Sequence, residues 1–328
     1  MDKRILSIWD FRAVPYSLGD LVTLLERLQI EKTIYGVDSF DIAFVYDPKV
    51  PARYIGYQGI TKKNYHYHFT TLMQIAMCNK NVNAFYIFDD YEKLYKFVNS
   101  YDVVCPSLGR IKNKDYTYRE NFNYIQDFYK DNKYIPKFEL RQGTLENVYH
   151  FYKNFSGKYP VICHIRNSQS ESQRNSNKSA WLKFFFEKSK LNDIVFILVG
   201  TKNETDYFRG IGNIIISKDY FNSAEYDMAL IASSYFFLGT RSGTMMMAYF
   251  TGAPCVIFDY DSAPHENIEH GSNFNFANPC QKLVWEKANT EMIVKEFERM
   301  YHDINKAKWL MNAKTFEIDT YNKSDIEL

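Results

Sequence analysis

The stretch of the sequence with the clearest potential for chemistry is Gly-Thr-Arg-Ser-Gly at residues 239–243, between an apolar run and a helix-like segment. Such a turn presents backbone N–H groups and hydroxyls at the positive end of a helix, where phosphate binds well. Arg241 can hold phosphate oxygens through two parallel hydrogen bonds. The alternative is a tight strand-to-helix turn with an exposed arginine. The sequence contains neither a GxxxxGK[ST] nor a GxGxxG loop, so these two phosphate loops are excluded.

Polar residues also follow three other apolar runs, VICHI, VFILVG and NIIIS, at the point where each run ends. Ligands of open α/β sheets bind beyond the carboxyl ends of the strands, so residues at these ends gather at one rim. We therefore expect a single anion-binding rim. Its candidate residues are His164, Arg166, Asn167, Gly200, Lys202, Ser217, Arg241, Ser242, Gly243 and Thr244.

A carboxylate lies near the end of the first apolar run of the chain. The run at residues 4–11 leads into Ser-Leu-Gly-Asp at residues 17–20, which opens an amphipathic helix. Asp20 lies in the first helical turn or at the N-cap, where aspartate is favoured for structural reasons alone. The functional alternative is a general base at the rim of the first strand.

Two short patterns raise the question of a metal ion. His66 and His68 form a His-x-His pair with no evident third ligand, and the acidic pair Asp89 and Asp90 is also typical of a turn that ends a strand. The five cysteines lack CxxC spacing, and three of them lie inside apolar runs, as buried core thiols do. We therefore expect no metal site and no cofactor.

A regular alternation of strands and helices is needed to bring these candidate residues together. Apolar runs typical of parallel strands are separated by longer segments with helical periodicity, which predicts α/β units. A helix-like segment followed by SGKYP separates the two sets of runs. We predict two Rossmann-like domains that face a cleft, at residues 1–152 and 153–328, with terminal helices in the second. The strand-like runs cover residues 4–11, 40–47, 83–90, 101–108, 160–167, 193–200, 213–219, 235–240 and 254–260.

The overall composition narrows the class of protein. The 328 residues carry a formal net charge of +1, without the basic surplus of a nucleic-acid-binding protein. No window has the roughly 18 apolar residues of a membrane-spanning helix, and the N-terminus does not read as a signal peptide. We expect a soluble cytoplasmic protein and leave open a peripheral association with the inner face of the membrane.

The C-terminal half resembles glycosyltransferases of the GT-B fold. The run YDMALIASSYFFLGTRSGTMMMAYFTGAPCVIF is similar to a segment of bacterial ADP-heptose lipopolysaccharide heptosyltransferases. The turn SLGD resembles the turn that carries their proposed base, which maps onto Asp20. HIRN resembles the His-x-Arg of GT-B fucosyltransferases, in which the arginine binds the pyrophosphate, and this maps onto Arg166. Arg241 stands where the heptosyltransferases usually carry an aspartate, so the resemblance implies a nucleotide sugar without specifying ADP-heptose.

The resemblance implies a hexosyl-, fucosyl- or heptosyltransferase of surface polysaccharide, lipopolysaccharide or capsule synthesis. The donor would be a nucleotide sugar bound on the C-terminal rim, and the acceptor a glycan or lipid-linked glycan on the N-terminal domain. The expected reaction is metal-independent and inverting, with Asp20 as the base. The alternatives are a nucleotide-sugar epimerase or hydrolase on the same fold and a non-catalytic protein that binds a phosphorylated ligand.

Overall fold

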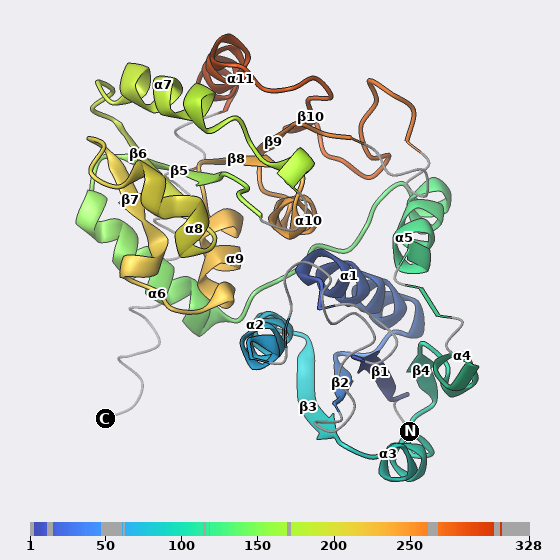
Figure 1. Cartoon of the computed structure of the whole chain (residues 1–328). Coiled ribbons are helices and arrows are strands. Elements are labelled where there is room, and N and C mark those ends of the chain that lie inside the picture. Colours follow the sequence, from blue (N-terminus) through green and yellow to red (C-terminus); the bar gives the residue numbers. More distant parts are fainter. Residues whose placement is uncertain are drawn as a thin grey trace, which may run out of the picture.

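Two parallel β-sheets organise the chain, one formed by each half of the sequence (Figure 1). Both sheets are seen in a computed structural model, which describes residues 3–11, 16–46, 61, 63–113, 116–117, 119–168, 172–261, 268–304 and 309. This architecture confirms the predicted α/β class with two Rossmann-like sheets.

The first sheet has four strands in the order β3-β2-β1-β4, and every pair is parallel. All residues of β1 and β2 are buried, as expected for parallel strands covered on both faces. The strands are β1 (Ile5–Asp10), β2 (Phe40–Val45), β3 (Val82–Phe88) and β4 (Val103–Cys105).

Six helices accompany the first sheet or follow it in the chain. Helices α1 and α2 lie on the side that faces the second half of the molecule, whereas α3 and α4 lie towards the other side (Figure 1). Helix α1 ends at Gly36, whose φ of 65° is the left-handed conformation that favours glycine at this position. The helices are α1 (Leu18–Tyr35), α2 (Tyr65–Cys78), α3 (Tyr91–Val98), α4 (Leu108–Asn113), α5 (Arg119–Asn132) and α6 (Gln142–Tyr152).

The second sheet has six parallel strands in the order β10-β9-β8-β5-β6-β7. Sequence runs predict all of these strands except the short edge strand β10. The strands are β5 (Tyr159–His164), β6 (Ile194–Val199), β7 (Ile214–Ile216), β8 (Phe236–Thr240), β9 (Cys255–Phe258) and β10 (Gln281–Leu283).

The helices of the second half cover both faces of its sheet. Helices α9 and α10 face the first half, and α7 and α11 cover the far face (Figure 1). The α-helices are α7 (Lys178–Lys188), α8 (Lys202–Thr205), α9 (Ala224–Ala232), α10 (Gly243–Thr251) and α11 (Thr290–Asp303). Short 3-10 helices lie at η2 (Lys153–Phe155), η3 (Ser172–Arg174), η4 (Asp206–Phe208) and η5 (Ser217–Asp219).

The two halves pack against each other through these facing helices. Helix α1 contacts α10, and α2 contacts α9. A single cluster of buried hydrophobic side chains includes residues of all four helices, such as Leu25 of α1 and Met247 of α10. The division of the chain between residues 152 and 153 stays a prediction, which limited proteolysis can check.

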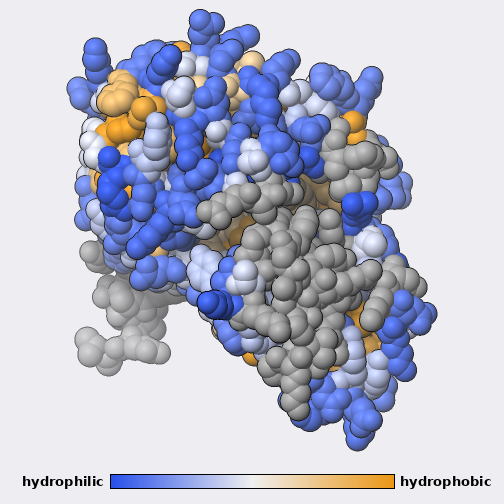
Figure 2. Space-filling view, viewed as in Figure 1, coloured by the Kyte–Doolittle hydropathy of each residue, from blue (hydrophilic) through white to orange (hydrophobic). Residues whose placement is uncertain are grey.

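The surface is mainly polar. In the view of Figure 2 most of the described surface is hydrophilic, with smaller hydrophobic areas. None of the helices in the described part of the chain has both the length and the apolar character needed to cross a bilayer.

Candidate functional site

A pocket of about 340 Å³ lies where the two halves meet. Its wall in the C-terminal half is formed by residues at or after the carboxyl ends of strands β5, β6, β7 and β8, because these ends of parallel strands meet at one edge of the sheet. Of the ten candidate residues named from the sequence for this rim, six line the pocket. They are His164, Arg166, Gly200, Ser242, Gly243 and Thr244.

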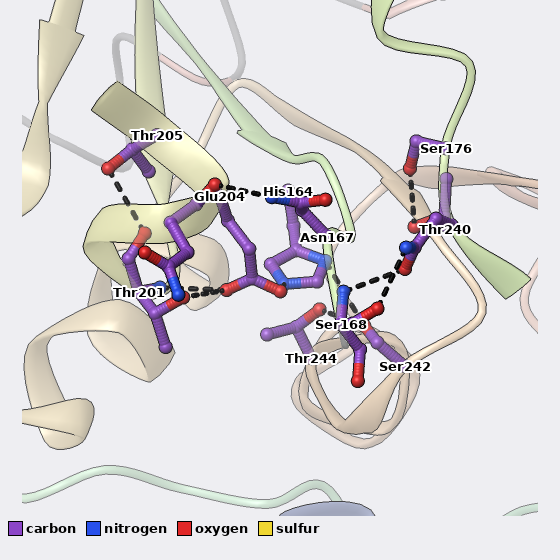
Figure 3. A network of polar contacts seen from close by, with 12 residues as sticks. His164, Asn167, Ser168, Ser176, Thr201, Glu204, Thr205, Thr240, Ser242 and Thr244 are labelled. Carbon is purple, nitrogen blue, oxygen red and sulfur yellow. Dashed lines mark hydrogen bonds and ion pairs between the residues drawn. The ribbon is translucent and has the colours of Figure 1, made fainter. Parts of the chain in front are cut away.

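A chain of polar contacts centres on His164, the last residue of β5 (Figure 3). Its Nδ1 atom lies 3.2 Å from the Oγ atom of Ser242. Its Nε2 atom lies 3.4 Å from the Oε1 atom of Glu204. Ser242 Oγ is also 2.7 Å from Thr244 Oγ1. The imidazole is thus held between the Glu204 carboxylate on one side and the Ser242 hydroxyl on the other, and Ser242 in turn contacts Thr244.

Glu204 is a member of this site that the sequence interpretation missed. It occupies the first turn of α8, where its Oε2 atom accepts hydrogen bonds from the Thr201 backbone N–H at 2.8 Å and the Thr201 hydroxyl at 2.9 Å. Burial alone would raise the pKa of Glu204, but His164 and these hydrogen bonds lower it to about 2. The detectable signal was Thr-x-x-Glu directly after a strand, which is the pattern of a capping box.

The start of helix α10 forms the part of the wall best suited to an anion. Ser242 is the N-cap residue, and its side chain makes no capping hydrogen bond to the helix. The first backbone N–H groups of a helix have no partner inside the helix, and they carry the positive end of its dipole. Together with Arg166 and His164, this helix end gives the wall the groups that bind phosphate oxygens.

Asp20 lies in the first turn of α1, and Ser17 is the N-cap residue of that helix. Burial raises the pKa of Asp20 to about 7, against the opposing effects of a Ser17 hydrogen bond and of the charge on Arg119. Asp20 does not line the pocket, but Leu18 of the same turn does. A carboxyl group with a pKa near neutral pH is suited to accept a proton from a bound hydroxyl.

The first turns of α1 and α10 touch through two glycines. A Cβ atom on Gly19 would lie 3.1 Å from the Cα atom of Gly243. A Cβ atom on Gly243 would lie 2.7 Å from Leu18 Cδ2 and 2.8 Å from the Gly19 backbone nitrogen. Only residues without a side chain permit this approach, which brings the turn that carries Asp20 against the turn that begins with Ser242.

Four of the predicted rim residues lie outside the pocket lining. Asn167 donates from its amide to the carbonyl of Asn203 at 2.8 Å, and Lys202 is an exposed residue at the start of α8. Ser217 is fully buried and donates to Asp227 Oδ1 at 3.2 Å. The guanidinium of Arg241 lies 5.5 Å from the centre of the Tyr260 ring, which is a cation–π contact.

An ion pair also lines the pocket. Lys218 Nζ lies 2.8 Å from Asp227 Oδ2, and both residues line the pocket. Burial raises the pKa of Asp227, and Lys218 and the Ser217 hydroxyl partly offset this effect. Such a pair can hold hydroxyl or amide groups of a ligand, because the lysine donates hydrogen bonds and the aspartate accepts them.

The metal candidates take structural positions in the part of the chain described here. Asp90 caps α3 by accepting from the Glu92 N–H at 2.7 Å, and Asp89 pairs with Lys93 at 3.0 Å. His66 lies against Tyr65, with ring centres 4.0 Å apart. Among the described residues, no group of three or more His, Cys, Asp or Glu side chains is placed to hold a metal ion.

Comparisons with known proteins give matches at the level of structure. No family model matches the chain, and no curated protein matches its sequence. A glycosyl transferase of family 9 from Veillonella parvula matches with a TM-score of 0.54 and 12% identity over 97% of this chain and 99% of that one. The ADP-heptose lipopolysaccharide heptosyltransferase II of E. coli matches with a TM-score of 0.56 and 11% identity over 90% and 98% of the two chains. The chain therefore has the GT-B fold of these enzymes.

Proposed function

We propose that this chain of GT-B fold is a glycosyltransferase that moves a sugar from a nucleotide-sugar donor to a hydroxyl of a glycan or lipid-linked glycan. The contact between Gly19 and Gly243 carries the proposal, because it brings two functions together. The turn on the α10 side has the groups for a diphosphate, and the turn on the α1 side has a carboxyl group whose pKa is near neutral.

The reaction would proceed by direct displacement with inversion. Asp20 accepts the proton of the acceptor hydroxyl while that oxygen forms a bond to the anomeric carbon of the donor. The bond from this carbon to the diphosphate oxygen breaks, and its electron pair leaves with the nucleoside diphosphate. Arg166, His164 and the N-terminus of α10 stabilise the negative charge on the leaving group.

The proposed roles differ among the cationic residues named from the sequence. Arg166 lines the pocket, whereas Lys202 and Arg241 do not. We therefore assign leaving-group stabilisation to Arg166 and not to the other two. The proposal also places the enzyme in the synthesis of a surface polysaccharide or glycolipid at the cytoplasmic face of a membrane.

A nucleotide screen tests the donor site. Thermal unfolding is measured with ADP, GDP, UDP and CDP for the wild type, for Arg166→Ala, and for Arg299→Ala as a control on helix α11. At 100 times its dissociation constant a ligand stabilises the native state by about 2.7 kcal/mol. We expect one nucleotide to stabilise the wild type and the control, and Arg166→Ala to bind it about 1.5–3 kcal/mol more weakly. If none of the four nucleotides stabilises the wild type, the assignment of this pocket as the donor site is wrong.

Turnover separates the proposal from its alternatives. The nucleotide identified in the screen is supplied as its sugar conjugates, with and without glycan acceptors. A glycosyltransferase forms a new glycoside only when the acceptor is present. An epimer or a free sugar formed at the same rate without acceptor would identify an epimerase or hydrolase, and binding without any turnover would identify a non-catalytic protein.

A further inference from the structure

Helix α2 presents a polar stripe to the pocket from the N-terminal half. Tyr67, Thr70, Thr71 and Gln74 all line the pocket, and their spacing of three, four and seven residues places them on one face of the helix. We call these four residues the α2 stripe. None of the four side chains is charged, whereas the opposite wall carries His164, Arg166 and Glu204.

The most unusual member of the α2 stripe is Tyr67. This residue is 58% exposed, which is high for a large aromatic residue. A tyrosine in such a place offers a flat apolar surface together with a hydroxyl group. Ligand pockets combine surfaces of this kind with a few fixed polar groups that determine orientation. The C–H face of a pyranose ring matches the flat aromatic surface, and the hydroxyls of the sugar match the fixed polar groups of the pocket.

Two other members of the α2 stripe, Thr71 and Gln74, make hydrogen bonds of their own. The Thr71 hydroxyl donates to the Tyr67 carbonyl oxygen at 2.9 Å, so its oxygen still has lone pairs that accept hydrogen bonds. Gln74 Oε1 accepts from the Ala224 backbone N–H at 3.3 Å, at the start of α9. This bond links the α2 stripe to the C-terminal half of the chain.

The location of the α2 stripe indicates which substrate it serves. Helix α2 belongs to the same half as Asp20, and Leu18 of the Asp20 turn lines the same pocket. The groups suited to phosphate lie on the other wall. A sugar ring on Tyr67 would therefore lie beside the turn that carries the base and across from the donor phosphates. A nucleobase could also stack on Tyr67, but it would have to cross from the wall that holds its own phosphates.

We propose that the α2 stripe is the acceptor subsite, and that it binds an uncharged pyranose ring whose C–H face lies on Tyr67. This inference rests on the proposed function and specifies its acceptor as a neutral sugar. The aromatic ring carries the contact, so the phenol hydroxyl is dispensable. Thr70, Thr71 and Gln74 supply hydrogen bonds to the hydroxyls of the sugar.

The test is saturation-transfer NMR with the methyl glycosides of glucose, galactose and mannose, in the presence of the nucleoside diphosphate that stabilises the wild type best. The proteins are the wild type, Tyr67→Ala, Tyr67→Phe, and Tyr134→Ala as a matched control. Tyr134 is 49% exposed and does not line the pocket. We expect Tyr67→Ala to weaken binding of the preferred glycoside at least about tenfold, which is about 1.4 kcal/mol. Tyr67→Phe and Tyr134→Ala should bind it like the wild type.

Two results would overturn the subsite. One is glycoside binding that is absent in the wild type or equal in the wild type and Tyr67→Ala. The other is a loss of nucleoside diphosphate affinity in Tyr67→Ala while inorganic diphosphate binds as before, which would place the nucleobase on Tyr67. A failure of the proposed function looks different, because no nucleoside diphosphate would then bind the wild type, and the acceptor subsite would fall with it.

Discussion

Two helix starts in the pocket region carry an acidic residue at the same position, and the two carboxyl groups differ in their pKa. In α1, Asp20 is the third helical residue after the N-cap Ser17, and in α8, Glu204 is the third after the N-cap Thr201. Glu204 contacts His164 and accepts two hydrogen bonds from Thr201, and its pKa is lowered to about 2. Burial dominates at Asp20 and raises its pKa to about 7.

The comparison shows that the partners, and not the local motif, set the role of each carboxyl group. A carboxylate that stays ionised at every physiological pH can hold an imidazole in one orientation through a lasting hydrogen bond. A carboxyl group that titrates near neutral pH can take up a proton and release it again. We therefore propose that Glu204 positions His164 and that Asp20 takes part in proton transfer.

The largest effect should come from Asp20→Asn. The amide keeps an oxygen that can accept a hydrogen bond, but it cannot accept a proton at neutral pH. Removal of a general base typically lowers the rate 10²–10⁴-fold. We expect a loss of turnover in this range with unchanged nucleotide affinity, measured by release of nucleoside diphosphate and by calorimetry. Asp90→Asn is the matched control, because Asp90 caps α3 and lies outside the pocket lining.

Asp20→Asn should lower turnover, but it should raise the stability of the protein relative to the wild type as the pH rises. The folded-state pKa of Asp20 is raised above its ordinary value, so the native state binds more protons than the unfolded state between about pH 4 and 7. The contribution of Asp20 to stability is complete below pH 4 and is lost as the pH rises through 7. Urea unfolding should therefore show the variant gaining stability relative to the wild type from pH 5 to pH 8. The reverse trend would contradict the raised pKa of Asp20, a residue that is partly buried at the start of α1.

A smaller effect is expected from Glu204→Gln. If Glu204 orients His164 towards the donor phosphates, this change should weaken nucleotide binding by about 1.5–3 kcal/mol, the range for hydrogen bonds to charged groups. If Glu204 only caps α8, glutamine keeps the oxygen that accepts from Thr201 and calorimetry should show unchanged affinity. Glu187→Gln, on the exposed side of α7, provides the control.

The smallest effect is predicted for Gly243→Ala, which tests the contact between the two helix starts. The added Cβ atom would lie 2.8 Å from the Gly19 backbone nitrogen, so α1 or α10 must shift. Overpacking of this kind costs about 1–3 kcal/mol, and the free energy of unfolding should fall by that amount. Gly143→Ala in α6 is the control, because its Cβ atom would meet nothing within 4 Å. Equal stability of the two variants would show that the helix starts do not depend on this contact.

Much of this site could be predicted from strand ends. His164, Arg166, Gly200 and Ser242 come together because parallel strands bring their carboxyl ends to one edge, and apolar runs locate those ends well. The direction in which each side chain of a turn points is harder to predict. Arg241 and Ser242 are neighbours in sequence, yet Arg241 turns to the Tyr260 ring while Ser242 faces His164.

The contacts between the two halves could not be predicted from patterns in the sequence. The approach of Gly19 to Gly243 and the packing of α2 on α9 depend on how two independently formed sheets are oriented. The α2 stripe illustrates the difficulty, because a polar helix face reads as solvent-exposed until a second domain covers it. The environment of Asp20 has the same origin, because the start of α10, far away in the chain, packs against the turn that carries Asp20.

The pH dependence of turnover shows whether Asp20 acts as the catalytic base. Release of nucleoside diphosphate is followed from pH 5.5 to 8.5 for the wild type and Asp20→Asn, with the donor identified by the nucleotide screen. If Asp20 is the base, kcat/KM of the wild type should rise about tenfold per pH unit at low pH and level off above about 7, where the carboxyl group is ionised. The variant should lack this rise. A profile that is flat for the wild type, or a rise that persists unchanged in Asp20→Asn, would contradict the account.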